Sequence, residues 1–183
     1  MNESDLLSFN PCSLTGIIDV ERHTAYISVG SNIGDKLLNC KKGVEVLTDL
    51  GVVAIIAWSH FYKTSPVDYK DQDWFVNAVV KVETILKPAD LLKEIVSVQH
   101  NAGRIYDKVR FGPRILDLDI ILYDDLVIDS PGLTIPHPRM HKRLFVLKPL
   151  CDIDSSVIHP VLKKDIKWLL DSLDDNEQEI IRY

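Results

Sequence analysis

Residues 110–121 (RFGPRILDLDII) determine where the last predicted sheet strand lies and which acidic residues it carries. The apolar and β-branched stretch Ile115–Tyr123 predicts a strand. Side chains alternate across a strand, so Asp117 and Asp119 should share one face while the residues between them join the core. Two adjacent carboxylates repel each other, and Mg²⁺, which prefers one or two carboxylates plus phosphate oxygens and water, would stabilise the pair. The alternative is a solvent-facing strand edge with two ordinary acids.

Positive charge gathers just before this strand, in a stretch that also contains Gly112 and Pro113. Cations beside a metal site are expected where a polyphosphate bridges them. A second run of basic residues follows Pro136 and could add phosphate contacts. Taken alone, either run would be an ordinary solvated loop. The two runs contain Arg104, Lys108, Arg110, Arg114, His137, Arg139, His141, Lys142 and Arg143.

Hydrophobic periodicity along the chain predicts an α+β fold. The order strand, helix, strand, strand, helix, strand is ferredoxin-like, with an antiparallel sheet and both helices on one face. A C-terminal extension after Tyr123 would cover other surface and complete a three-layer α/β/α sandwich. We expect residues 1–22 to be a loosely held, disordered extension and residues 23–183 to be a single domain. The predicted elements are strands His23–Val29, Val52–Lys63, Trp74–Thr84 and Ile115–Tyr123, with helices from Asp35 to Gly51 and from Pro88 to Ala102.

Length and composition indicate an ordinary globular protein of 183 residues, 46% hydrophobic and 26% charged. A net charge of −6 argues against nucleic acid or anionic lipid as a general partner. No apolar run approaches the ~20 residues that span a bilayer. Cys12, Cys40 and Cys151 form neither a disulfide framework nor a zinc motif. We therefore expect a cytoplasmic protein without nucleic-acid or membrane partners.

A third group of residues suits a flat heterocycle. Thr64-Ser65-Pro66-Val67 forms a turn, and Trp74-Phe75-Val76-Asn77 follows it. Aromatic rings stack on heterocycles, and an asparagine offers both a donor and an acceptor to a ring edge. These residue types fit a pterin. Core aromatics beside a turn are an equally good interpretation of the spacing.

These motifs together resemble the 6-hydroxymethyl-7,8-dihydropterin pyrophosphokinase family of folate biosynthesis. The resemblance runs from Ala25 to about Leu150, and it includes residues 25–32, 61–66, 71–72, 75–78, 103–104, 110–121 and 135–137. It implies Mg²⁺-dependent transfer of pyrophosphate from ATP to 6-hydroxymethyl-7,8-dihydropterin, with AMP as the second product. It also implies two Mg²⁺ ions, ATP as co-substrate, a monomer, and an association with dihydropteroate synthase.

The resemblance implies a role for each matching residue. Asp117 and Asp119 would bind the two Mg²⁺ ions, with Asp119 also a candidate proton acceptor, and Arg104 and Arg114 would steady the transferring group. The sequence departs from the commoner pattern at Gln99, where the family often has glutamate. The expected ATP-binding residues are Gln99, Arg104, Arg110, Arg114, Ile120, Leu133, Thr134, His137 and Arg143. The expected pterin-binding residues are Thr64, Ser65, Pro66, Val67, Phe75, Asn77, Phe111 and Phe145.

Two other functions fit parts of the sequence. A ferredoxin-like domain can be a non-catalytic module that binds a small ligand, because fold alone does not determine function. An enzyme with a different acceptor alcohol would keep the same acids and arginines. A binding module would form no AMP from ATP, and a series of acceptors would separate the two enzymes.

Overall fold

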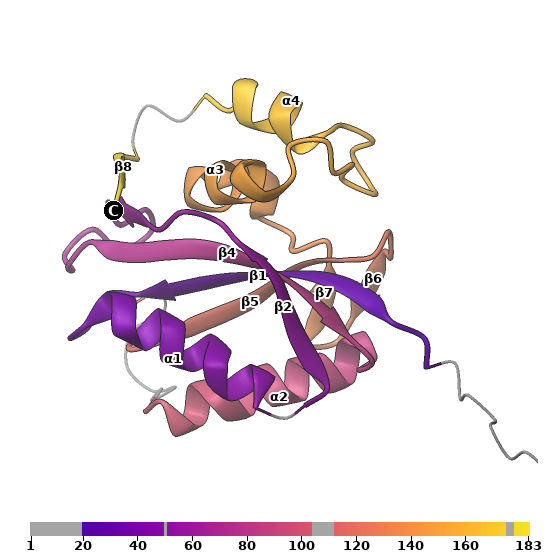
Figure 1. The fold of residues 1–183 in the computed structure, drawn as a ribbon. Coiled ribbons are helices and arrows are strands. Elements are labelled where there is room, and N and C mark those ends of the chain that lie inside the picture. Colours follow the sequence, from indigo (N-terminus) through magenta and orange to yellow (C-terminus); the bar gives the residue numbers. More distant parts are fainter. Residues whose placement is uncertain (1–19, 50, 104–111, 175–177) are drawn as a thin grey trace, which may run out of the picture.

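The computed structural model describes residues 20–49, 51–103, 112–174 and 178–183. Within these ranges a six-stranded sheet forms the centre of the molecule, and its paired strands are antiparallel. Helices lie on both faces of the sheet (Figure 1). The strand order is β5 (Asp117–Tyr123), β1 (His23–Ser31), β4 (Phe75–Thr84), β3 (Tyr62–Thr64) and β8 (Ile180–Arg182), and β2 (Val53–Trp58) also pairs with β4.

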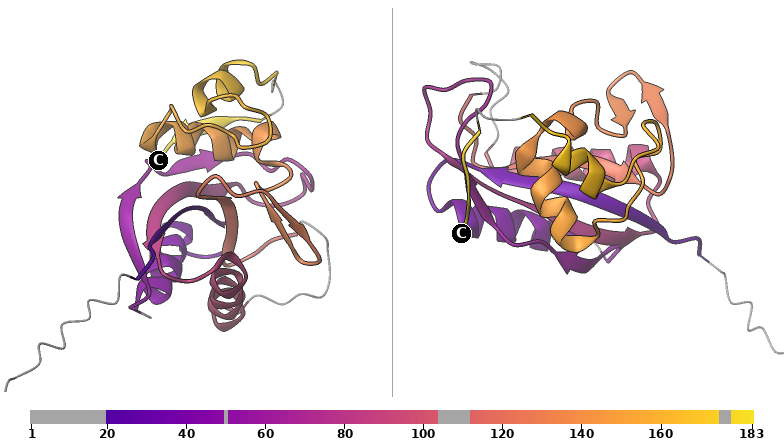
Figure 2. Two further views of the ribbon diagram at one scale, coloured as in Figure 1. Left: turned by 90° about the vertical axis from the view of Figure 1, so that its right-hand side faces the viewer. Right: turned by 90° about the horizontal axis from the view of Figure 1, so that it is seen from above.

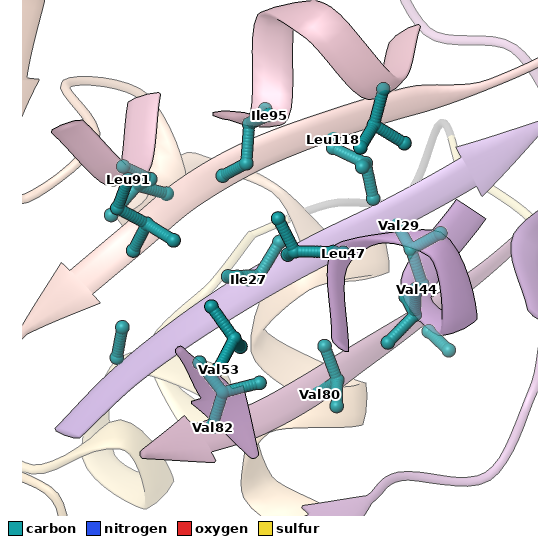
Figure 3. Packing of buried hydrophobic residues seen from close by; sticks show 14 of the residues in the cluster. Ile27, Val29, Val44, Leu47, Val53, Val80, Val82, Leu91, Ile95 and Leu118 are labelled. Atoms are coloured by element: carbon teal, nitrogen blue, oxygen red, sulfur yellow. The ribbon is translucent and has the colours of Figure 1, made fainter. Parts of the chain in front are cut away.

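One face of the sheet is covered by α1 (Lys36–Thr48) and α2 (Pro88–Asn101). Figure 3 shows Val44 and Leu47 of α1 packed with Ile27 and neighbouring strand residues, and Ile95 of α2 belongs to the same cluster. Full burial of an aliphatic side chain contributes about 1.5–3 kcal/mol, so this cluster is a main source of stability. Both predicted helices therefore lie on one face.

The ends of these two helices follow from local sequence. Asp35 caps α1, because its side chain accepts a hydrogen bond from Leu38 N at 3.1 Å. Gly51 follows the helix with φ +70°, a backbone conformation that favours glycine. Pro88 is the first residue of α2, where its missing N–H costs nothing.

The chain after the hairpin of β6 (Ile128–Ser130) and β7 (Leu133–Ile135) covers the other face, whereas the hairpin itself packs into the cluster under α1 and α2. The hairpin is followed by the short helix η1 (Met140–Lys142), and then by α3 (Leu144–Ile153) and α4 (Ile166–Asp171). The left view of Figure 2 shows α3 and α4 across the sheet from α1 and α2. The second core cluster includes Leu147 and Leu150 of α3, packed on the strand face that carries Val79.

The prediction of one continuous strand over Val52–Lys63 is wrong. Strand β2 ends at Trp58 and β3 begins at Tyr62. Between them the Ser59 hydroxyl accepts a hydrogen bond from Val79 N at 2.9 Å and donates one to His60 O at 2.7 Å. A side chain thus takes a place that a backbone carbonyl holds in a regular ladder, and the strand is interrupted there.

The remaining boundaries agree with the sequence to within a few residues. Strand β5 begins at Asp117 rather than at Ile115. The α+β class, with an antiparallel sheet covered by helices, is confirmed. Residues 1–19, most of the predicted N-terminal extension, lie outside the described residues. No helix in the described part of the chain has the length and apolar character needed to cross a bilayer.

Candidate active site

Asp117 and Asp119 lie on β5, opposite Gly30 and Ser28 of β1. Leu118, between them, is 2% exposed and belongs to the core cluster under α1 and α2. Because side chains alternate along a strand, both carboxylates project from the other face of the sheet, and both residues are partly exposed. The fold therefore presents the acid pair toward solvent on the side that carries α3.

Arg114 is held against this pair. Its Nη1 donates to Asp117 Oδ2 at 2.8 Å, and the two side chains are 18% and 23% exposed. Its backbone is also bound in both directions by Asn32, since Arg114 N donates to Asn32 Oδ1 at 2.7 Å and Asn32 N donates to Arg114 O at 3.1 Å. Asn32 in turn donates through Nδ2 to Gln72 Oε1 at 2.9 Å. A guanidinium group is thereby fixed beside a carboxylate at the surface.

Gln99 supports the strand between the two acids. Its side chain is almost fully buried, and its Oε1 accepts a hydrogen bond from Leu118 N at 3.0 Å. Strand β5 is the last strand of the sheet on this side, so that N–H points away from β1 and needs a partner. The contact of Gln99 with ATP remains a prediction. The structure shows its amide bound to the backbone that carries Asp117 and Asp119.

His137 and Arg143 form the cationic side of the site. Arg143 Nη1 lies 3.5 Å from His137 Nε2, and His137 N donates to Ile121 O at 3.0 Å. Burial, together with the positive charges of Arg143 and Arg139, lowers the pKa of His137 to about 4, so the imidazole is neutral near pH 7. Burial also lowers the pKa of Arg143, while Asp119 acts in the opposite direction. The arrangement leaves positive charge close to the carboxylate pair.

Three of the residues expected to contact a pterin, Thr64, Phe75 and Asn77, lie on β3 and β4. Asn77 Nδ2 donates to Thr64 Oγ1 at 2.7 Å, and both side chains are buried. Asn77 pairs with Gly30, which pairs on its other side with Asp117. A Cβ atom on Gly30 would lie 2.4 Å from Asn77 Oδ1. Asn77, Gly30 and Asp117 are therefore neighbours in a row across three strands, with an amide on one side of Gly30 and a carboxylate on the other. The central position has room for glycine but not for a residue with a Cβ atom.

The other expected residues are distributed unevenly. Phe145 lies beside Arg143, whose guanidinium carbon is 5.3 Å from its ring centroid, and Phe75 Cδ1 would be 4.0 Å from a Cβ on Gly30. Ile120 is 5% exposed in the core, so its side chain points away from the acid pair. Thr134 and Leu133 are on β7 and Val67 is exposed, while Ser65 and Pro66 are half-buried. Arg104, Arg110 and Phe111 lie outside the described residues.

Two residues that the sequence did not single out become important in the structure. Asn32 follows β1 directly and is only 2% exposed. A buried polar residue at a strand end indicates a special role, but its burial is known only from the structure. Gln178 bonds to both Ser65 and Phe145 from the C-terminal segment. A lone glutamine near the end of the chain gives no such signal.

The donor set suits a hard cation that is shared with a ligand. In the described ranges no group of three or more histidine, cysteine or acidic side chains could enclose a metal. Two carboxylates on one strand face, beside Arg114 and Arg143, form an open half-site instead. Such a pair fits Mg²⁺ completed by phosphate oxygens and water.

Comparisons with known proteins identify chains of similar sequence and fold. A model of the family described as 7,8-dihydro-6-hydroxymethylpterin-pyrophosphokinase (HPPK) matches residues 26–155. The 2-amino-4-hydroxy-6-hydroxymethyldihydropteridine pyrophosphokinase of Bacillus subtilis (strain 168) is 42% identical over 133 residues, which cover 73% of this chain and 79% of that protein. The folic acid synthesis protein fol1 of Schizosaccharomyces pombe is 40% identical over 149 residues, 81% of this chain but 20% of that protein.

The matched region thus spans about a fifth of the length of fol1. Among solved structures, HPPK-DHPS in complex with substrates has a TM-score of 0.67 at 15% identity. That match covers 83% of this chain and 43% of the solved one, and it concerns the fold alone.

Proposed function

Because the chain belongs to the 7,8-dihydro-6-hydroxymethylpterin-pyrophosphokinase family, we propose that it transfers pyrophosphate from ATP to 6-hydroxymethyl-7,8-dihydropterin and releases AMP. The observation that carries the proposal is the row Asn77–Gly30–Asp117, with Arg114 bound to its carboxylate end. The Asn77 amide, which can form hydrogen bonds with the edge of a heterocycle, thereby lies near groups that can bind phosphate. This juxtaposition is what a pterin kinase needs.

Asp117 and Asp119 would hold two Mg²⁺ ions, which when bound neutralise phosphate charge. In the proposed step the hydroxymethyl oxygen attacks the β-phosphorus of ATP in line, the bond from that phosphorus to the α-phosphate oxygen breaks, and AMP leaves. Little covalent help is required, so positioning and charge stabilisation dominate the rate. Asp119 is the candidate acceptor for the hydroxyl proton.

The cationic residues would bind the triphosphate. Arg104 and Arg114 would stabilise the negative charge that grows on the transferring group, and Arg143 would bind the phosphates. Arginine stays protonated, so none of the three acts as a base. Neutral His137 adds a hydrogen-bonding imidazole beside Arg143. The remaining proposed ATP contacts are Gln99, Arg110, Ile120, Leu133 and Thr134.

The pterin would bind on the Asn77 side of the row. The Asn77 amide presents a donor and an acceptor to the edge of the pterin ring, and phenylalanine rings can stack on the faces of that ring. The Thr64–Asn77 hydrogen bond fixes that amide. The proposed pterin contacts are Thr64, Ser65, Pro66, Val67, Phe75, Asn77, Phe111 and Phe145.

We also propose that residues 23–183 form one ferredoxin-like domain in a three-layer sandwich. The order β5, β1, β4 and then β2 or β3 supports it, with α1 and α2 on one face and α3 and α4 on the other. A monomeric, cytoplasmic protein is proposed, and Cys40 and Cys151 are free thiols, as a reducing compartment favours. The solved HPPK-DHPS chain supports an association with dihydropteroate synthase.

The test is to incubate the protein with ATP, Mg²⁺ and 6-hydroxymethyl-7,8-dihydropterin and to measure AMP by chromatography. We expect AMP and the pterin pyrophosphate in equal amounts. Asp119→Asn should abolish most of the turnover, whereas Asp125→Asn, at an exposed position beyond the same strand, should leave it unchanged. Pterin binding without AMP would favour a binding module, and AMP only with another alcohol would favour a different acceptor.

A further inference from the structure

The C-terminal segment holds the end of β3. Strand β8 pairs with β3, with Ile180 opposite Thr64. Just before β8, Ser65 N donates to Glu179 O at 2.9 Å, and Glu179 N donates to Ser65 Oγ at 2.8 Å. Ser65 is therefore bound through its backbone and its side chain. Residues 178–183 lie beyond the range 26–155 that the family model matches.

Gln178 connects this arrangement to α3. Its Nε2 donates to Ser65 O at 3.1 Å, and its Oε1 accepts from Phe145 N at 3.2 Å. Phe145 is the second residue of α3, where a backbone N–H has no acceptor within the helix. The N-cap residue, Arg143, makes no side-chain capping bond. Gln178 thus supplies a capping acceptor to this helix from a distant part of the chain.

Burial of Gln178 strengthens both of its hydrogen bonds. The residue is 8% exposed, so water competes poorly for either bond. One side chain therefore ties the backbone of Ser65 to the first turn of α3. A displacement of Ser65 should therefore change the position of the first turn of α3, and a displacement of that turn should change the position of Ser65.

We propose that Gln178 is a positioning residue for pterin binding, which acts by fixing Ser65 relative to Phe145. The inference rests on the proposed function, because both residues belong to the proposed pterin site. Gln178 acts through these two residues rather than on the reacting atoms. Its loss should weaken pterin binding more than ATP binding, since Arg143 is also held beside His137.

The experiment compares three variants of the full chain. Gln178→Met keeps the length of the side chain and removes both hydrogen bonds. Gln178→Glu keeps an acceptor for Phe145 N and removes the donor to Ser65 O. Ile181→Thr is the control, because Ile181 is on β8 of the same segment and is 54% exposed. KM for each substrate, kcat and amide hydrogen exchange at Phe145 and Ser65 are measured, and thermal melting checks folding.

We expect Gln178→Met to raise the KM for pterin about tenfold, or about 1.4 kcal/mol, with KM for ATP and kcat changed less than threefold. Amide exchange at Phe145 should accelerate in this variant. Gln178→Glu should give a smaller rise in the KM for pterin and keep Phe145 protected. Ile181→Thr should match the wild type in every measurement. If Gln178→Met does not fold, the Glu variant alone must show the selective effect.

The outcomes separate this inference from the proposed function. A wild-type chain that forms AMP, with Gln178→Met showing the wild-type KM for pterin, overturns the inference and leaves the function standing. An equal rise in both KM values also overturns it. If the wild type forms no AMP, the function fails, and unchanged exchange at Phe145 in Gln178→Met then rejects the positioning role as well.

Discussion

Replacing Gly30 with alanine should disturb the candidate site from within the sheet. Gly30 lies in β1, and its backbone is not among those with positive φ, so alanine would not strain the backbone. The added Cβ would lie 2.4 Å from Asn77 Oδ1, too close for two non-bonded atoms. The Asn77 amide must then move, although its Nδ2 is bound to Thr64 Oγ1 at 2.7 Å.

The size of the effect follows from the burial of this pair. Asn77 is 5% exposed and Thr64 is 1% exposed, so water cannot easily replace a broken bond. The added Cβ forces either an overpacked arrangement or the loss of the buried hydrogen bond, and each of these costs about 1–3 kcal/mol. We expect Gly30→Ala to lower the free energy of unfolding by about 2–3 kcal/mol. For a chain of this size, Tm should fall by roughly 4–12 °C.

The assay is a double-mutant cycle read by chemical and thermal unfolding. Asn77→Ala removes the group that alanine at position 30 would strike, so Gly30→Ala should cost much less in that background. A coupling free energy of about 1–2 kcal/mol is expected between the two positions. Pterin affinity should also fall in Gly30→Ala. If Gly30→Ala costs the same in both backgrounds, the close approach of Gly30 to Asn77 is refuted.

Substitutions at Arg114, Ser59 and His137 test three other contacts of the fold and the site. Arg114→Lys keeps the charge but loses the guanidinium that binds Asp117 through Nη1, so kcat should fall about 10- to 1,000-fold with little change in Tm. Normal kcat would remove Arg114 from the proposed transfer step. Ser59→Ala removes the acceptor for Val79 N and should cost about 1–3 kcal/mol in urea unfolding, whereas an unchanged midpoint would show that the bond contributes nothing. The pKa of His137 is about 4 in the folded chain against about 6.5 when unfolded, so the unfolded state binds the extra proton between these values. Stability should therefore fall as pH drops from about 6.5 to about 4, and His137→Asn should flatten this decline; an equal slope in both proteins would contradict the assignment.

The sequence predicted well wherever a local pattern carries the information. Alternation along residues 115–123 placed Leu118 in the core and the two aspartates opposite it, because strand geometry fixes the side-chain period at two. Asp35 and Gly51 marked the limits of α1 for equally local reasons, namely a side-chain cap and a positive φ. The prediction that failed was the continuous strand Val52–Lys63. There the Ser59 hydroxyl replaces a backbone carbonyl as hydrogen-bond acceptor, and hydrophobic periodicity carries no information about that replacement.

By itself, the sequence determined the order of strands and helices, the pairing of two acids on one strand face, and the resemblance to a pterin pyrophosphokinase. Only the tertiary structure decided which distant groups hold that site in place. Asn32 lies 82 residues from Arg114, and Gln178 lies 113 residues from Ser65. A buried polar side chain must find a hydrogen-bond partner, but its partner is chosen by how the strands and helices pack, and that information is absent from any local pattern.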